Sequence, residues 1–270
     1  MKPLAEFPVT ARRAVQGVFC DLDDTLTTDG RLMAGAYAAL ERLAGAGLPV
    51  VVITGRPAGW CDHIARMWPV AAVVGENGAF YFRYDHARRE MQRRFVDDAA
   101  TRAAHRLRLA AIGREILKAA PGAALAADQL YRETDLAIDW CEDVARLPRE
   151  TVDRIVALME ENGLTARVSS IHVNGWFGAY DKLTMARTLM REAFGIDLDA
   201  ARTRYVFVGD SPNDAPLFAH FPHAIGVANI RDFEGRLAHA PAYVTRARGG
   251  GGFHEAAICL LAARKQKKLN

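Results

Sequence analysis

Residues 18–27 read VFCDLDDTLT, an apolar run that stops abruptly at three carboxylates and two hydroxyls. The apolar residues predict a strand buried on both faces of a parallel sheet, and polar groups just beyond such a strand lie where open α/β sheets bind ligands. Asp21 and Asp23 can share one pocket if the chain turns there, one as nucleophile or metal ligand and the other as proton carrier. Loop carboxylates are also often solvated or cap the next helix, and Asp24 with Thr25 fits that simpler interpretation.

The next strand end along the chain offers an anion-binding loop. Residues 50–53 are apolar and run directly into Thr54, Gly55 and Arg56. The threonine provides a hydroxyl, and the glycine lets its backbone N–H approach a phosphate oxygen closely. For Arg56, a role in the site and an ordinary place on the surface both stay open.

Two later segments add carboxylates and a lysine. The apolar run 205–208 ends at the sequence GDSPND, where Asp210 and Asp214 suit a hard, oxygen-liganded cation such as Mg²⁺. Lys182 opens an amphipathic stretch, and a lysine at a helix start gains nothing from the helix dipole. It is therefore either solvated or held there by an anion. With the two earlier strand ends, these segments supply the parts needed for phosphoryl transfer.

In order and placement, these segments resemble the four motifs of the haloacid dehalogenase superfamily. The motifs lie at residues 21–25 (DLDDT), at Thr54, at Lys182 and at residues 209–214. The sequences GENGA at residues 75–79 and AYVT at residues 242–245 are similar to Cof-type members of subfamily IIB, which include sugar-phosphate phosphatases. Asp24 stands where those members more often carry glycine, a departure that leaves both catalytic aspartates intact.

The resemblance implies an α/β fold, with a Rossmann-like core built on a parallel sheet and an inserted α+β cap of the C2 type. Spacing locates the insertion independently of the resemblance. The 29 positions from Thr25 to Thr54 accommodate one helix and one strand, whereas the 128 positions from Thr54 to Lys182 require an additional module. We expect the core domain to comprise residues 1–80 and 178–270 and the cap domain residues 81–177.

The resemblance also implies a chemical role for the catalytic carboxylates. Asp21 would attack phosphorus to form an aspartyl-phosphate, and Asp23 would protonate the leaving alcohol and then activate the water that completes hydrolysis. Mg²⁺ would be held by Asp21, by the backbone carbonyl of Asp23, and by Asp210 and Asp214. Thr54 and Lys182 complete the catalytic set. The leading interpretation is a Mg²⁺-dependent phosphomonoester hydrolase acting on a sugar phosphate or a similar small phosphometabolite.

Substrate contacts are expected from both domains. The candidates are Thr54, Gly55, Arg56, Lys182 and Asn213 in the core and His172 and Asn174 in the cap. Asn213 would orient the lysine and carboxylates. In the cap, His172, Asn174 and Trp176 alternate, so they share one face if the segment is a strand. That face could instead pack on the cap helices, and for Trp176 burial is the better interpretation.

Composition bounds the class of protein. A chain of 270 residues that is 50% hydrophobic can bury two modest cores. No apolar run approaches a membrane span, and residues 1–14 lack the apolar core of a signal peptide. Four scattered cysteines fit a reducing cytoplasm, and a net charge of +3 is too small to indicate nucleic acid. We expect a cytoplasmic protein that binds a small phosphorylated metabolite, with its oligomeric state open.

Three alternatives compete with the phosphatase. A phosphomutase would use the same aspartyl-phosphate but return the phosphoryl group to a rebound sugar. A non-catalytic phospho-acceptor or phospho-ligand binding protein also uses Asp, Thr and Lys, but Asp23, the motif order and the large insertion argue against it. A dehalogenase would need neither Asp23 nor Mg²⁺.

Overall fold

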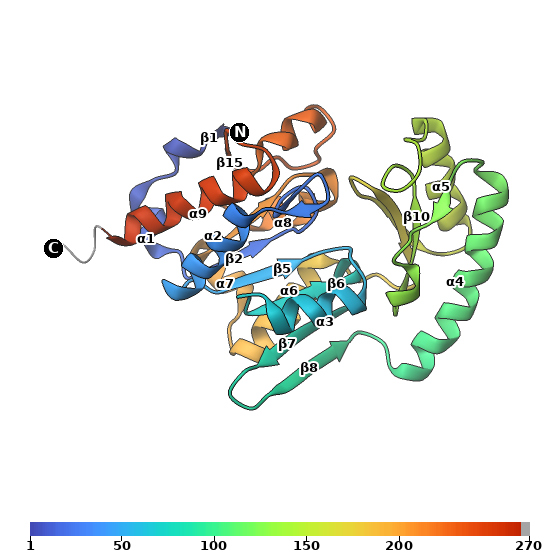
Figure 1. Ribbon diagram of the computed structural model, residues 1–270, viewed down its shortest axis with the longest axis horizontal. Coiled ribbons are helices and arrows are strands. Elements are labelled where there is room, and N and C mark those ends of the chain that lie inside the picture. The colour runs from blue at the N-terminus through green and yellow to red at the C-terminus, as the bar shows by residue number, and fades with distance from the viewer. Residues whose placement is uncertain (266–270) are drawn as a thin grey trace.

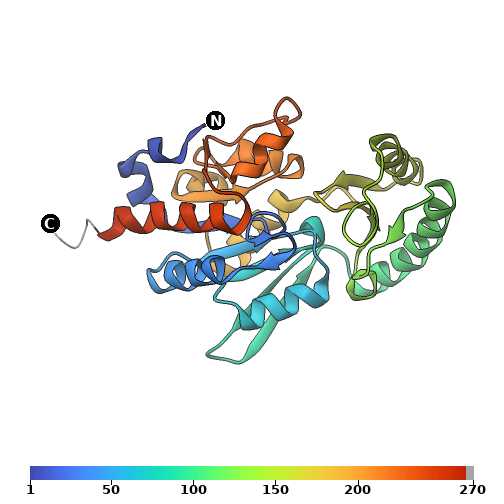
Figure 2. The same cartoon turned by 45° about the horizontal axis from the view of Figure 1, so that its top comes forward.

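The structure, a computed structural model, describes residues 1–265. Figure 1 shows a larger unit that holds the N-terminus and a smaller unit that carries the helices α4 (Ala99–Ala119) and α5 (Arg149–Glu161). The turned view in Figure 2 keeps the two units side by side. Among the residues described, no helix combines the length and apolarity needed to cross a membrane.

The larger unit is built on a nine-stranded sheet. In spatial order its strands are β1 (Lys2–Pro3), β15 (Tyr243–Val244), β14 (Ile225–Gly226), β13 (Tyr205–Gly209), β2 (Gly17–Cys20), β5 (Val50–Ile53), β6 (Ala72–Gly75), β7 (Phe80–Asp85) and β8 (Glu90–Phe95). The first seven run parallel to one another, and β7 and β8 form an antiparallel hairpin at one edge. The expected α/β fold with a sheet dominated by parallel strands is therefore confirmed.

Helices cover both faces of this sheet, as its fully buried central strands require. On one face the core is formed with α2 (Ala34–Gly45), α3 (Ala58–Met67) and α9 (Gly249–Lys265). On the other it is formed with α6 (Lys182–Phe194), α7 (Leu198–Ala201) and α8 (Ala215–His220). The short helix α1 (Val9–Ala14) packs beside α9, and a separate small hairpin joins β3 (Thr27–Thr28) to β4 (Arg31–Leu32).

The smaller unit has a sheet and a hydrophobic core of its own. Its four antiparallel strands, in spatial order, are β11 (Thr165–Val168), β12 (His172–Trp176), β10 (Asp135–Asp139) and β9 (Ala124–Leu125). The helices α4 and α5 lie on one face, where Ile116, Ile155 and Met159 are fully buried. Asp98 caps α4 by accepting the N–H of Thr101 at 2.8 Å.

The hairpin β7–β8 lies in the large sheet, although the expected boundary at residue 81 would assign most of it to the cap domain. Its first strand is hydrogen-bonded to β6, from Val73 opposite Phe82 to Gly75 opposite Phe80. The hairpin joins this sheet because Phe80 and Phe82 belong to the larger core and stack on each other at 4.4 Å. The unit with its own sheet therefore begins with α4, and the bounds 81–177 for a cap domain stay a prediction.

Candidate active site

The carboxyl ends of three neighbouring strands bring the motif residues together. Asp21 follows β2, Thr54 follows β5 and Asp210 follows β13. Because these strands run parallel with Val18 opposite Val50 and Val206, their ends meet at one edge of the sheet. The N–H of Asp21 donates to the carbonyl of Val208 at 2.9 Å, which extends the strand pairing into the loop.

Lys182 joins the two carboxylate motifs. Its Nζ lies 2.6 Å from Asp21 Oδ1 and 2.9 Å from Asp214 Oδ1, and all three side chains are buried. The lysine stands at the first position of α6, after Asp181 has capped the helix through the N–H of Thr184 at 2.7 Å. Of the two possibilities that its position left open, the structure therefore shows the anion-bound one.

Burial controls the charge state of this cluster. It raises the pKa of Asp21, and although Lys182 opposes the effect, the pKa reaches about 8. Burial also raises the pKa of Asp210 well above its usual range, with further increases from Asp21 and Asp214. For Lys182, burial lowers the pKa, but the neighbouring charges of Asp21 and Asp214 outweigh it and raise the value. One lysine therefore cannot balance all three carboxylates in their ionised form, and without a further cation the cluster tends to take up protons.

The carboxylates of Asp21, Asp210 and Asp214 fit a divalent cation. Each offers an oxygen, and these three oxygens lie within 4.8 Å of one another. Hard oxygen donors with uncompensated negative charge are the set that Mg²⁺ binds. The carboxylate of Asp23 lies outside this set and pairs with Arg56 instead, so only its backbone carbonyl is a candidate ligand.

Asn229 supports the acidic cluster and was not among the expected residues. Its Nδ2 donates to the carbonyl of Asp24 at 2.9 Å and to Asp210 Oδ2 at 3.3 Å, while its Oδ1 accepts the N–H of Gly249 at 3.0 Å. Thr25 Oγ1 donates to the other oxygen of Asp210 at 3.0 Å. Asn229 follows β14, so its place at a further strand end was the signal in the sequence that could have found it.

The loop after β5 has the form expected of an anion-binding turn. Gly55 lines a small cavity at the strand ends, whereas Thr54 is fully buried beneath the loop. The Thr54 hydroxyl oxygen accepts the N–H of Arg56 at 3.0 Å, which closes the turn. A Cβ at Gly55 would lie 3.2 Å from the amide of Asn77, so a side chain at this position would crowd that amide.

Arg56 is buried, with only 4% of its side chain exposed, so the alternative of a surface role does not apply. Its Nε lies 3.0 Å from both carboxylate oxygens of Asp23. Its two terminal nitrogens reach the smaller unit, where NH1 lies 3.3 Å from Asp128 and NH2 lies 2.5 Å from Glu142. The guanidinium therefore connects the expected acid-base residue to the opposite unit.

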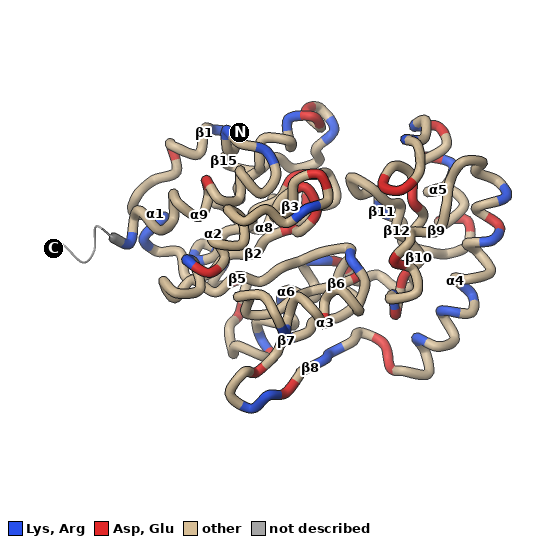
Figure 3. Tube along the Cα trace, viewed as in Figure 1, with Lys and Arg blue, Asp and Glu red and all other residues tan. Residues whose placement is uncertain are grey.

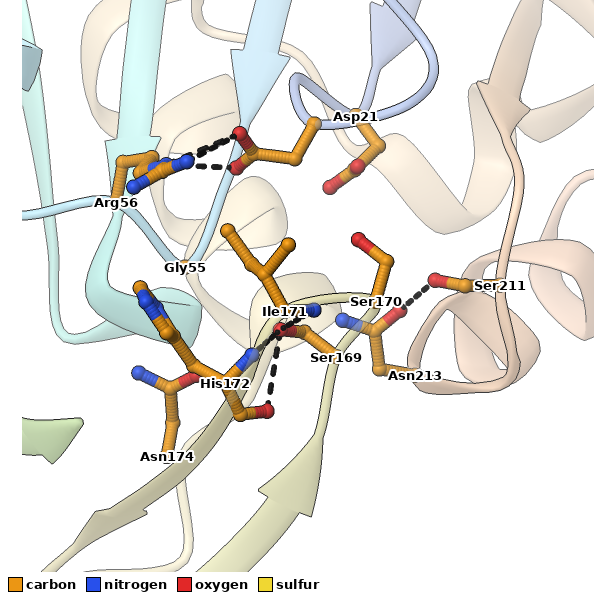
Figure 4. Close-up of a pocket in the computed structure, with 11 residues that line it drawn as sticks. Asp21, Gly55, Arg56, Ser169, Ser170, Ile171, His172, Asn174, Ser211 and Asn213 are labelled. Carbon is orange, nitrogen blue, oxygen red and sulfur yellow. Dashed lines mark hydrogen bonds and ion pairs between the residues drawn. The ribbon is translucent and has the colours of Figure 1, made fainter. Parts of the chain in front are cut away.

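The tip of the β11–β12 hairpin forms the facing wall of the cavity (Figure 4). The expected residues His172 and Asn174 line it and are 2% and 3% exposed. Asn174 Nδ2 donates to Asp135 at 2.9 Å. Trp176 is buried and stacks on Tyr180, which agrees with the interpretation of packing for this residue.

Asn213 also lines the cavity but does not contact the lysine cluster. Its Oδ1 accepts the hydroxyl of Ser211 at 2.6 Å (Figure 4). The side chain that does orient the cluster is Asp214, which holds Lys182 with Oδ1 and accepts the N–H of Asp210 with Oδ2 at 3.2 Å. The expected role of Asn213 in orienting that cluster is therefore filled by its neighbour.

A second contact joins the two units behind the anion-binding loop. Arg132 NH1 donates to the carbonyl of Gly55 at 2.8 Å. The carboxylate of Glu76, in the larger unit, accepts three hydrogen bonds from the smaller unit. They come from the N–H groups of Glu133 at 2.9 Å and Thr134 at 2.6 Å and from the Thr134 hydroxyl. The side chain of Arg132 and the residue Glu76 are both fully buried. We call this set of contacts the interdomain clasp.

Metal-free protein should lose stability as the pH rises from about 4 to about 8. The pKa of Asp21 is raised to about 8 in the folded protein, so the folded state binds more protons than the unfolded state in this range. The stabilisation from the protonated Asp21 is complete below the pKa of this residue in the unfolded chain. It disappears as the pH rises through its pKa in the folded protein. Thermal unfolding in EDTA measures the slope, and Mg²⁺ should raise the melting temperature most at high pH. An equal slope in Asp21→Asn would contradict this assignment.

Comparisons with known proteins agree with this fold. Residues 18–108 match the sequence model of haloacid dehalogenase-like hydrolases. A phosphoglycolate phosphatase of Methanobrevibacter smithii is 24% identical over 249 residues, which cover 90% of this chain and 97% of that protein. An HAD/COF-like hydrolase from Plasmodium vivax aligns with a TM-score of 0.64 at 16% identity, over 97% of this chain and 100% of that one. The sucrose-phosphatase of Synechocystis sp. PCC6803 aligns with a TM-score of 0.59 at 15% identity, over 91% and 98%.

The fold and the site define an α/β protein whose chemistry lies at the carboxyl ends of parallel strands. Over residues 18–108 the chain is similar to the haloacid dehalogenase-like hydrolases, in agreement with its motifs. Its likeness to Cof-like structures is a likeness of fold.

Proposed function

We propose that the protein is a Mg²⁺-dependent phosphomonoester hydrolase that acts through an aspartyl-phosphate on Asp21, with a sugar phosphate or a similar small phosphometabolite as substrate. One observation carries this proposal. Asp21 and Asp23 line the same small cavity, one bound to Lys182 and the other to Arg56. A nucleophile held by a lysine and a second carboxylate on the same loop, both lining one cavity, fit the two steps of phosphate ester hydrolysis.

In the first step, a carboxylate oxygen of Asp21 attacks phosphorus and the bond to the leaving oxygen breaks. Asp23 gives its proton to that oxygen, so the alcohol leaves neutral. In the second step, a water molecule gives a proton to Asp23 and attacks the same phosphorus. The bond between phosphorus and Asp21 then breaks and inorganic phosphate leaves. Both residues end in their initial states.

The residues around Asp21 control charge during these steps. Lys182 on Oδ1 holds the nucleophile in place and favours its anionic form. Thr54 and the N–H of Gly55 are the proposed donors to phosphoryl oxygens. Asp21, Asp210 and Asp214, with the backbone carbonyl of Asp23, would hold Mg²⁺. When bound, this ion offsets the repulsion between the attacking carboxylate and the phosphate.

The smaller unit is proposed to act as the cap. Figure 3 shows that the facing edges of the two units carry acidic and basic positions, as other parts of the chain also do. Residues of both units line the small cavity. A cap over the strand ends excludes bulk water from the phosphorylated aspartate and contacts the leaving group. The pairing of β7–β8 with the large sheet favours a cap that starts near α4 rather than at residue 81.

The relatives supply reasons to test small phosphate esters first. One is named a phosphoglycolate phosphatase, and another is a sucrose-phosphatase solved with sucrose and phosphate. We propose a small phosphorylated metabolite as the binding partner and the cytoplasm as the location, the latter from the scattered cysteines.

Phosphate release from a panel of sugar phosphates, phospho-acids and nucleotides tests the proposal. We expect release in Mg²⁺ that disappears in EDTA and returns when Mg²⁺ is added again. An isomerised ester without free phosphate would indicate a mutase instead. A panel on which nothing reacts would contradict the hydrolase.

A further inference from the structure

The interdomain clasp fixes where the cap sits on the core. Its bonds connect the anion-binding loop at Gly55 with Arg132, and Glu76 with Thr134, and the side chains of Glu76 and Arg132 have no exposure to solvent. Moving the cap away at this point would leave buried charged groups without partners, which is costly. The position of the cap as a whole is therefore a property of the working site, and the space at the strand ends can change only through movement of the tip itself.

The space at the strand ends is small. The cavity between Asp21, Asp23 and the cap tip is about 20 Å³, little more than one water molecule requires. In Figure 4 the side chain of Ile171 extends from the tip toward the strand ends. Phosphate and Mg²⁺ must displace part of the tip, and a bulky leaving group would have to displace much more.

A larger cavity of about 770 Å³ lies next to the Ser169–Ser170 part of the tip, but it is not the place for the leaving group. It borders Asp24, Asp210 and Asn229, on the side of the acidic cluster. Of these two cavities, Asp23 lines the small one. Because the leaving oxygen must face its proton donor, the leaving group lies in the small cavity.

The small cavity carries a carboxylate-binding pair that an internal carboxylate now occupies. Arg56 and His172 both line it. Glu142 of the cap binds Arg56 in fork geometry, with Oε1 2.5 Å from NH2 and Oε2 3.2 Å from NH1. His172 Nε2 approaches Glu142 Oε2 to 2.8 Å, without the alignment of a good hydrogen bond. Burial raises the pKa of Glu142, but His172 and Arg56 outweigh it and lower the value to about 2.

Charge balance decides how a second carboxylate could bind here. Arg56 already contacts the carboxylates of Asp23, Asp128 and Glu142. Asp128 is buried and also bound to Arg132, whereas Glu142 is 26% exposed and can turn toward water. A ligand carboxylate must therefore replace Glu142 rather than join it.

We propose that the leaving group is a small hydroxy acid of two or three carbons, whose carboxylate takes the place of Glu142 on Arg56 and His172. This inference rests on the proposed hydrolase activity and narrows its substrate class. Ile171 limits the size of the leaving group, and the Arg56–His172 pair selects its charge. Glu142 acts as an internal competitor that keeps the pair satisfied when no substrate is bound.

Three esters separate size from charge. We compare steady-state kinetics of the full chain with three substrates. 3-Phosphoglycerate and glycerol 3-phosphate differ in a carboxylate against a hydroxymethyl group, and glucose 6-phosphate replaces the short chain with a ring. We expect kcat/KM for 3-phosphoglycerate to exceed each of the others by at least about tenfold, since one charge-assisted contact of this kind is worth that much.

Variants test the size limit set by Ile171 and the charge selection by the Arg56–His172 pair separately. Glu142→Gln should raise the ratio of kcat/KM for 3-phosphoglycerate over glycerol 3-phosphate, because it weakens the competitor, and His172→Ala should lower it. Ile171→Ala should raise the ratio for glucose 6-phosphate over 3-phosphoglycerate. Glu161→Gln is the matched control: this glutamate is ion-paired with Arg154 on the cap surface, so both ratios should stay constant. If His172→Ala lowers the melting temperature too far for kinetics, Glu142→Gln still provides the test, because Glu142 is more exposed.

Each possible result has a defined meaning. Preference for glucose 6-phosphate, equal rates for the two three-carbon esters, or a Glu142→Gln ratio that falls would overturn the inference. Asp21-dependent release from p-nitrophenyl phosphate would keep the hydrolase in all three cases. No release from any ester in Mg²⁺ would overturn both.

Discussion

Replacing Asp21 with asparagine should reduce phosphate release by at least about a thousandfold while the protein stays folded. An amide cannot form the aspartyl-phosphate, so the two-step route is lost rather than slowed. Stability should not fall, because the change removes one of three crowded buried carboxylates, and burial raises the pKa of this one, Asp21. In metal-free protein at high pH, the melting temperature of the variant should equal or exceed that of the parent.

Phosphate release and thermal unfolding, measured on the same preparations, check both parts. Asp29→Asn is the matched control, since it makes the same chemical change at an exposed position in the turn between β3 and β4. Asparagine tolerates the positive φ of 49° found there. This control should retain activity within about twofold of the parent, as surface substitutions generally do. Turnover retained in Asp21→Asn would remove Asp21 as the nucleophile.

Replacing Lys182 with methionine should lower the free energy of unfolding by roughly 3–5 kcal/mol in metal-free protein. The change leaves Asp21 and Asp214 buried without the cation that now lies 2.6 Å and 2.9 Å from them. The loss should grow with pH, because at low pH the carboxylates can take up protons instead. Mg²⁺ should restore part of the stability by supplying positive charge to the same oxygens.

Denaturant unfolding in EDTA, at two pH values, measures this loss. Lys118→Met is the control, because Lys118 is an exposed residue of α4. The double variant Lys182→Met with Asp21→Asn should recover much of the lost stability, since it removes the charge that the lysine balanced. A loss below about 1 kcal/mol in the single variant would mean that the cluster is not held together by this ion pair.

The motif residues could be predicted because each follows an apolar run directly. Asp21, Thr54 and Asp210 come immediately after their strands, and parallel pairing places such ends at one edge without further information. Lys182 was recognisable because it is a cation at the N-terminus of a helix, where the helix dipole disfavours positive charge. These signals are local, so the core of the site could be read from the sequence.

The contacts between cap and core could not be predicted in this way. Arg56 and Glu142 are 86 positions apart, and Glu76 and Thr134 are 58 apart. The spacing of hydrophobic residues does not predict such pairs, because each pair depends on how two separately folded sheets pack against each other. The hairpin β7–β8 shows the same limit: alternation predicts its strands, but the sheet that they join is decided by phenylalanines that pack beside β6.

The departure at Asp24 has a structural explanation. This residue adopts φ of 57°, the left-handed region in which glycine is unstrained. Glycine at this position in similar sequences is therefore a matter of backbone conformation, and Asp24 reaches the same conformation as one of the residue types that tolerate it. The departure changes neither Asp21 nor Asp23.

The order of strands in the large sheet also determines when the acidic site can exist. β2 is paired with β13, almost two hundred residues later, and β1 is paired with β15. Pairings between such distant segments form slowly, and during synthesis they must wait for the later strand. The smaller unit closes its core within residues 109–177 and can fold earlier. Asp21 therefore lies beside Asp210 and Asp214 only when the core is complete, so a nascent chain does not yet have the acidic cluster.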